Sequence, residues 1–241
     1  MTESITRESQ PIKRQSCRHC LRPKNACICQ HICATNNQIS LIILQHPIEI
    51  NEPKNTARLL HLCLKNSHIH VGEQFSDAFF SPRELSAEPN TQIYDVLLYP
   101  ETQEEKSLGI LTPLHLDRNS VKTGDKSTST TPTRLSNNIR LWVIDATWRK
   151  SRKMLYLNPS LQKMPRLTLI NCPATIYSIR RAHSENQLST LEASCYALAQ
   201  LEQGAVDYTP VLKTFANFVE QQKMFIPNSP DIQFTQSMEP L

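Results

Sequence analysis

The sequence predicts an α/β fold with a mainly parallel sheet flanked by helices. Short continuous apolar runs, typical of strands buried on both faces, alternate with stretches whose apolar residues recur at helical spacing. This alternation is typical of βα units. The 241 residues can hold one such domain and a small appendage. We expect a disordered tail and a short cysteine-rich, metal-binding segment, called the knuckle below, over 1–36. The α/β domain is expected over 37–225 and a loose tail over 226–241.

Each predicted strand is an apolar run that ends at a proline, a charge or a polar turn: 39–46, 67–71, 93–99, 141–145 and 166–170. The predicted helices carry apolar residues three or four positions apart: 55–65, a segment from Trp148 to the break at Asn158-Pro159, 189–203 and 210–223. Residues 72–90 are expected to be mostly loop. The polar stretch over 112–138 is expected to be a disordered insert or surface loop without chemistry.

Positive charge is concentrated in the middle of the chain. The net charge is only +4, but residues 140–183 hold nine basic side chains against one acid, whereas residues 184–241 hold seven acids against two lysines. A local excess of this size favours a polyanionic substrate. The alternative is a solvated helix face.

We expect a cytoplasmic protein without a membrane segment. No apolar run approaches the roughly 18 to 20 residues that a bilayer-spanning helix needs. The N-terminus also lacks the apolar region of a secretory signal. The eight cysteines are therefore expected to be thiols or metal ligands rather than disulfides.

Four cysteines near the N-terminus have metal-ligand spacing. A C-x2-C pair and a C-x-C pair, six residues apart, suit two tight turns that face one tetrahedral Zn²⁺. A closed site of four thiolates leaves no position for water, so its role would be structural. Redox pairing is the alternative, and Cys33, His19 and His31 are further donors nearby. The expected ligands are Cys17, Cys20, Cys27 and Cys29.

Asp145 ends a predicted strand that begins with four apolar residues in a row. A carboxylate at the carboxyl end of a buried strand, where a helix begins, is a common place for chemistry in an open α/β sheet. The alternative is that Asp145 caps the helix near Trp148, for which Thr147 is another candidate. His46 ends a predicted strand in the same way, although a lone histidine there is more often structural. The chain has only four glycines and neither common phosphate-binding motif.

Asp145-Ala146-Thr147-Trp148 resembles the D-x-T-W signature of the DTW-domain family, and further landmarks occur in the family's order. The resemblance covers about residues 15–220. The landmarks are the four cysteines, His46-Pro47 with Glu49, Asn55 to Leu60, Leu98-Tyr99-Pro100, Tyr177 to Arg180, and Ser189 to Ala193.

The resemblance implies a SPOUT-like fold with a trefoil knot, present as a monomer or homodimer, that acts on tRNA and not on DNA or membranes. The implied reaction transfers the 3-amino-3-carboxypropyl group of S-adenosylmethionine to N3 of a uridine, in the variable loop or the D-loop with the variable loop favoured, and releases 5′-methylthioadenosine. N3 must lose its proton to become a nucleophile, and Asp145 is our candidate base. Trp148 would stack on adenine or uracil, unless it is a core residue. The catalytic candidates are Asp145, Thr147 and Trp148.

The remaining candidate residues would bind the donor or the RNA. Arg180 and Glu192 could clamp the donor's amino-acid group, and Ser189-Thr190 would present helix N-terminal amides to an anion. The donor-site candidates are Leu98, Tyr99, Pro100, Glu101, Arg180, Ser189, Thr190, Leu191 and Glu192. The RNA candidates are Arg58, which could instead brace its helix, Arg149, Lys150, Arg152 and Lys153. Two alternatives stay open: an RNA methyltransferase that uses the same donor, and a non-catalytic zinc-containing RNA-binding protein.

Overall fold

A computed structural model describes residues 15–81, 93–100, 139–169, 172–176 and 188–225. The candidates Glu101 and Arg180, the landmark residues from Tyr177 to Arg180, the 112–138 insert and the 226–241 tail lie outside these ranges. None of the helices in the described ranges combines the length and hydropathy that a bilayer crossing requires.

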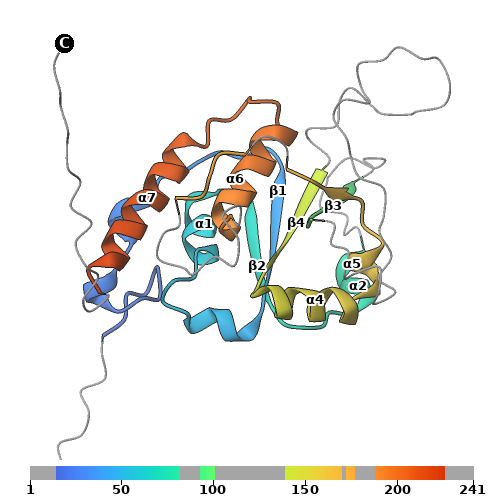
Figure 1. Cartoon of the computed structure of the whole chain (residues 1–241), viewed down its shortest axis with the longest axis horizontal. Helices are drawn as coiled ribbons and strands as arrows, with labels where there is room; N and C mark the ends of the chain where they lie inside the picture. Colours follow the sequence, from blue (N-terminus) through green and yellow to red (C-terminus); the bar gives the residue numbers. More distant parts are fainter. Residues whose placement is uncertain (1–14, 82–92, 101–138, 170–171, 177–187, 226–241) are drawn as a thin grey trace, which may run out of the picture.

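Within the described ranges, five strands form one parallel sheet, as the alternating pattern predicts (Figure 1). The order β2-β1-β4-β3-β5 places β1 and β4 side by side in the middle. Their register pairs Gln45, the last residue of β1, with Asp145, the last residue of β4. The strands are β1 (Ser40–Gln45), β2 (Ser67–Val71), β3 (Tyr94–Leu98), β4 (Ile139–Asp145) and β5 (Arg166–Leu167).

Helices cover both faces of the sheet, so that it is the middle of three layers (Figure 1). One face packs against α1 (Ala57–Cys63) and α6 (Thr190–Leu201), and α7 (Thr209–Lys223) packs on these two helices. The other packs against α2 (Asp77–Phe80), α4 (Trp148–Leu157) and α5 (Pro159–Gln162). All seven residues of β4 are buried, as expected of a central parallel strand covered on both faces.

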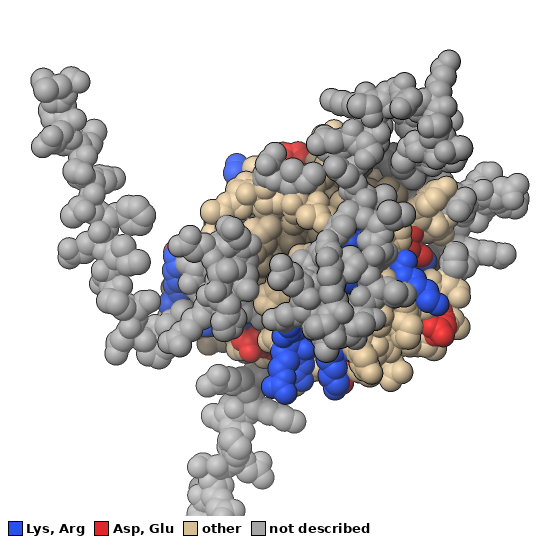
Figure 2. All heavy atoms as spheres, turned by 45° about the vertical axis from the view of Figure 1, so that its right-hand side comes forward, with Lys and Arg blue, Asp and Glu red and all other residues tan. Residues whose placement is uncertain are grey.

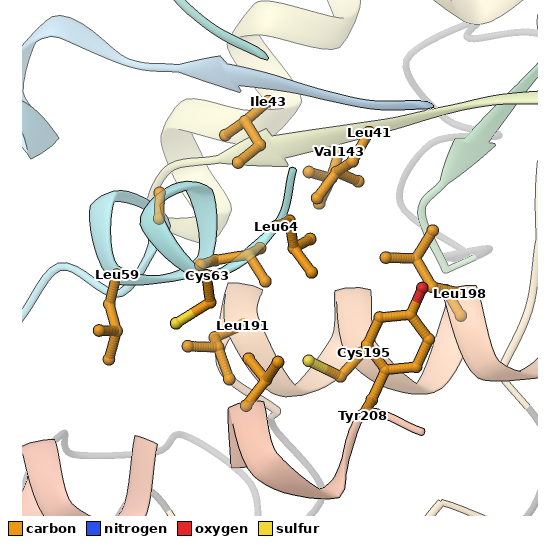
Figure 3. Close-up of a cluster of buried hydrophobic side chains, with 14 of the residues drawn as sticks. Leu41, Ile43, Leu59, Cys63, Leu64, Val143, Leu191, Cys195, Leu198 and Tyr208 are labelled. Carbon is orange, nitrogen blue, oxygen red and sulfur yellow. The ribbon is translucent and has the colours of Figure 1, made fainter. Parts of the chain in front are cut away.

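Alternate residues of each strand supply the two cores. Leu41 and Ile43 of β1 belong to the cluster under α1 and α6, whereas Ile42 and Leu44 belong to the cluster under α4. Figure 3 shows the first cluster, in which Leu191, Cys195 and Leu198 of α6 and Leu59 and Cys63 of α1 lie beneath the strand residues Leu41, Ile43 and Val143. Burying one such leucine stabilises the fold by about 1.5–3 kcal/mol.

The N-terminus of α6 is fixed by a capping box. The Ser189 hydroxyl accepts a hydrogen bond from the Glu192 amide (3.2 Å), and the Glu192 carboxylate accepts one from the Ser189 amide (2.9 Å). The predicted start of this helix is thus confirmed, with Ser189 as its cap. The reciprocal pair satisfies two backbone donors that a helix N-terminus otherwise leaves open.

The structure refines three local predictions. The short helix α2 lies within 72–90, expected to be mostly loop, because Phe80 is buried against Trp142. Helix α1 begins at Ala57 rather than at residue 55, since the Asn55 side chain accepts the Ala57 amide (3.0 Å). Thr147 stands at the N-cap of α4 but forms no side-chain capping bond among the described residues.

Candidate functional site

The candidate site lies where β1 and β4 end, at the carboxyl edge of the sheet. The chain leaves β1 through His46, whose amide donates to the Asp145 carbonyl (3.0 Å), and enters the 3-10 helix η3 (Pro47–Asn51). It leaves β4 through Asp145 and enters α4. Figure 1 shows both helices at this lower edge of the sheet.

The Asp145 carboxylate is buried and held by side chains from three separate segments. Oδ2 accepts hydrogen bonds from Gln45 Nε2 (2.9 Å) and Asn55 Nδ2 (2.6 Å), and Oδ1 accepts one from the Thr190 hydroxyl (2.8 Å). These partners come from β1, from the turn before α1 and from the first residue of α6. Among the described residues no amide of α4 bonds to the carboxylate, so capping of α4 does not explain Asp145. An ionised carboxylate, which only accepts, suits three donors.

Trp148 begins α4 and stands beside this carboxylate in the chain. Its side chain is 41% exposed, so it is not a core residue. The indole meets the buried Tyr99 ring edge-to-face, with centroids 6.1 Å apart, and the Tyr99 hydroxyl lies 3.2 Å from Ser151 Oγ. Leu98 is buried, whereas Pro100 and Thr147 are exposed. The arrangement leaves an aromatic surface open to a planar ligand.

The start of α6 faces the same site from the other side of the sheet edge. Thr190 reaches Asp145, whereas Leu191 is fully buried in the core. Glu192 is also fully buried: Oε2 accepts from Thr175 Oγ1 (2.8 Å) and Oε1 from the Ile176 amide (2.8 Å), in addition to the capping box. Glu192 therefore fastens the 175–176 segment to α6, which favours a positioning role over direct capture of the donor.

The four basic residues of α4 are not equivalent. Arg149 is exposed and Lys150 is half-buried, whereas Lys153 forms a salt bridge to Glu73 (Nζ to Oε2, 2.6 Å). This hydrogen bond from Lys153, with a second from His46, lowers the pKa of Glu73. Figure 2 shows Lys and Arg side chains gathered along the lower rim, where Figure 1 places α4.

His46 is a structural residue in this arrangement. Its Nδ1 accepts the Ile48 amide (3.2 Å), which makes it the cap of η3, and its Nε2 contacts the Glu73 carboxylate. Both ring nitrogens are thus engaged, and the ring joins η3 to the loop after β2. The structure therefore favours a structural role for this histidine over a catalytic one.

The cysteine knuckle brings four sulfur atoms together. The Sγ atoms of Cys17, Cys20, Cys27 and Cys29 all lie within 4.8 Å of one another, with Cys17–Cys29 at 3.6 Å and Cys20–Cys27 at 3.7 Å. The edge of a tetrahedron of sulfurs around Zn²⁺ measures about 3.8 Å for zinc–sulfur bonds of about 2.3 Å. These four residues could therefore hold a metal ion. The Cys20 and His19 amides lower the pKa of Cys17 to about 6, whereas burial raises the pKa of Cys29 to about 12, so it is the sulfur spacing that carries the metal assignment.

The other donors near the knuckle have different partners. Cys33 Sγ accepts from the Thr214 hydroxyl (3.4 Å), and His19 offers its carbonyl to Arg58 Nη2 (2.7 Å). Among the described residues, neither Cys33 nor His19 nor His31 belongs to the sulfur cluster. The Arg58 contact joins α1 to the knuckle and fits the alternative that this arginine braces its helix.

Sequence reasoning assigned no role to Gln45 or Asn55, the two side chains that hold Asp145 Oδ2. Gln45 does carry a signal, since it is a polar residue that ends an apolar strand one position before His46. Asn55 occurs among the landmarks, but only the fold shows that its amide faces the carboxylate.

The chain is similar to known proteins over most of its length. A family model described as DTW domain matches residues 14–223. Relatives named tRNA-uridine aminocarboxypropyltransferase 2 are 29% identical in Macaca fascicularis, 28% in Drosophila melanogaster and 30% in Mus musculus. The matches cover 80%, 80% and 79% of this chain and 59%, 68% and 57% of the relatives. The chain thus spans little more than half of the macaque and mouse proteins. No solved structure matches it.

Proposed function

The chain belongs to the DTW domain family, and from this membership we propose that it is a tRNA-uridine aminocarboxypropyltransferase. It would transfer the 3-amino-3-carboxypropyl group of S-adenosylmethionine to N3 of a uridine in tRNA, with the variable loop as the favoured position. The observation that carries the proposal is the buried Asp145 carboxylate. Three donors hold it at the sheet edge, in the family's signature, beside an exposed tryptophan.

The proposed reaction needs a base for the uridine N3 proton. Asp145 accepts this proton, N3 forms a bond to the methylene carbon next to the sulfonium, and the bond between that carbon and sulfur breaks. The bonding electron pair stays on sulfur, which leaves neutral 5′-methylthioadenosine. A positioned general base of this kind contributes about 10²- to 10⁴-fold to the rate. The amides of Gln45 and Asn55 keep the carboxylate in one orientation for this step.

The donor would lie against the aromatic surface next to Asp145. Trp148 offers an exposed indole for stacking, with Tyr99 behind it. The Ser189 amide is already bonded to Glu192, so an anionic group at the start of α6 would meet the Thr190 amide. Glu101 and Arg180, together with Leu98, Pro100 and Leu191, remain donor-site candidates within this proposal. Glu192 is proposed to position the 175–176 segment.

We assign the knuckle to a structural Zn²⁺ held by the four thiolates, since its sulfur spacing fits a tetrahedral ion. Arg149, Lys150 and Arg152 are proposed phosphate contacts that set tRNA affinity without choosing the base. Lys153 would contribute less because Glu73 already neutralises it. The SPOUT-like class, its knot and a monomeric or homodimeric state are further parts of the proposal.

Mass spectrometry of tRNA nucleosides tests the proposal directly. The purified protein is incubated with S-adenosylmethionine and unmodified tRNA, and the digest is analysed for a modified uridine and for methylthioadenosine. A uridine that gains an aminocarboxypropyl mass, with methylthioadenosine released, supports the proposal. A methyl-sized gain indicates the methyltransferase, and no gain despite tight binding of tRNA indicates the non-catalytic RNA-binding protein.

A further inference from the structure

Arg22 connects the cysteine knuckle to the rest of the domain. It lies between the two ligand pairs, after Cys20 and before Cys27, and its carbonyl accepts the Cys17 amide (2.7 Å). The position of its backbone is therefore fixed by the same turn that places the first pair of sulfur atoms. When the knuckle folds, it therefore also fixes the position of Arg22.

The side chain of Arg22 leaves the knuckle and reaches the turn before α1. Its Nη2 donates a hydrogen bond to the Asn55 carbonyl (3.1 Å), and the guanidinium lies over the Phe218 ring of α7, 4.7 Å from the centroid. Phe218 is fully buried, so the ring is a fixed platform. A planar guanidinium can lie flat on the ring while its N–H groups donate within the plane, a geometry that a compact ammonium group does not offer.

Asn55 connects Arg22 to the Asp145 carboxylate through two hydrogen bonds. Its backbone carbonyl faces Arg22, and its side-chain Nδ2 donates to Asp145 Oδ2 at 2.6 Å. The side-chain oxygen accepts the Ala57 amide (3.0 Å) and Gln45 Nε2 (3.3 Å), which fixes the orientation of the amide. Since Gln45 also donates to Asp145, both donors to Oδ2 depend on where Asn55 stands.

We propose that the knuckle positions the Asp145 carboxylate through Arg22 and Asn55, and that Arg22 is thus a positioning residue of the active site. The inference deepens the proposed function, because it gives the knuckle a task at the reacting group. Other contacts hold the knuckle on the domain without Arg22. They are Arg58 to the His19 carbonyl, Thr214 to the His31 carbonyl (2.6 Å) and Gln221 to the Cys27 carbonyl (3.1 Å).

The first test compares Arg22→Ala with Arg18→Ala in the full chain. Arg18 is exposed on the same knuckle, so its replacement removes an equal charge without touching Asn55. We expect Arg22→Ala to lower kcat about tenfold, the effect of displacing one charge-assisted hydrogen bond. The KM for tRNA should stay within twofold of that of Arg18→Ala. Millimolar guanidinium ion should restore part of the lost kcat. Arg22→Lys replaces Arg22→Ala in every comparison if the alanine variant does not fold.

A double-mutant cycle with Asn55→Ala separates positioning from an independent role. If Arg22 acts through Asn55, the double variant has the kcat of Asn55→Ala alone, because the second change removes nothing further. Multiplicative losses would overturn the proposal. An equal loss of kcat in Arg18→Ala would do the same, since it would reduce the effect to charge.

One readout does not depend on the proposed function. In NMR spectra of wild-type protein and Arg22→Ala, both with their metal content measured, the Asn55 side-chain amide is expected to shift and to exchange faster with solvent. If the wild type modifies no uridine but this amide responds, the proposed function fails and the coupling stands. If metal content is equal and the amide is unchanged, the coupling is refuted whatever the activity.

Discussion

Replacing Asp145 by asparagine is the most direct test of the site, because the structure can accommodate the amide. The asparagine oxygen can take the place of Oδ2 and accept from Gln45 and Asn55, while its NH₂ group faces the Thr190 hydroxyl, which can also accept. All three charge-assisted hydrogen bonds become neutral ones, the third with its direction reversed, at a cost of about 1–3 kcal/mol in the free energy of unfolding. The variant should therefore fold.

The effect on catalysis should be much larger than the effect on folding. Loss of the general base lowers kcat by about 10²- to 10⁴-fold, which corresponds to about 3–5 kcal/mol of transition-state stabilisation. The assay is single-turnover transfer of labelled S-adenosylmethionine to tRNA at saturating concentrations, with tRNA affinity measured separately. Asp207→Asn is the matched control, because Asp207 is exposed and bonds the Thr209 amide at the start of α7. A folded Asp145→Asn protein with kcat within twofold of wild type would refute the base assignment.

Three further predictions concern the metal, the acid range and the RNA surface. Cys20→Ser should lose the one equivalent of metal expected in the wild type, which elemental analysis measures. The accompanying loss of about 3 kcal/mol in the free energy of unfolding should lower Tm by about 6–12 °C in thermal unfolding. The pKa of Glu73 is lowered, chiefly by Lys153, so its charge stabilises the fold above its unfolded pKa, near 4.5, and this contribution disappears as pH falls through the lower folded value. Denaturant unfolding from pH 6 to 3 should show the free energy of unfolding of the wild type falling towards that of Glu73→Gln in that window. A difference between the two proteins that does not change with pH would contradict the ion pair. Arg149→Ala should reduce the salt dependence of tRNA binding by about 0.7–0.9 in log–log slope, whereas Lys153→Ala and the α7 control Lys213→Ala should change it less.

The sequence predicts the local elements well because their signals are local. The apolar runs of β1 and β4 need burial on both faces, and the Ser189–Glu192 spacing marks a helix start whatever the rest of the chain does. The order β2-β1-β4-β3-β5 has no such signal, since it pairs strands far apart in the chain. The same holds for Lys153: four basic residues on one helix look alike until the fold brings Glu73 to one of them.

The residues of the site also differ in whether a local sequence signal predicts them. Asp145 could be singled out because it ends a buried strand, but its partners could not, since they come from segments that meet only in the folded sheet. Asn55 illustrates why. Its side chain reads locally as a helix-start residue, through the Ala57 amide, and its second bond to the carboxylate depends on the β1–β4 register.

The two oxygens of Asp145 are not equivalent, and this assigns them different tasks. Oδ2 accepts two amide donors whose orientation is fixed, because Asn55 and Gln45 also bond to each other (3.3 Å). Oδ1 accepts one hydroxyl, from Thr190, and a hydroxyl can rotate to another acceptor. The uridine proton is therefore expected at Oδ1. In Asp145→Asn the NH₂ group stands at this position, so a donor replaces the acceptor where N3–H arrives. The expected loss then lies at the upper end of the 10²- to 10⁴-fold range, and a loss near the lower end would instead place the proton on Oδ2.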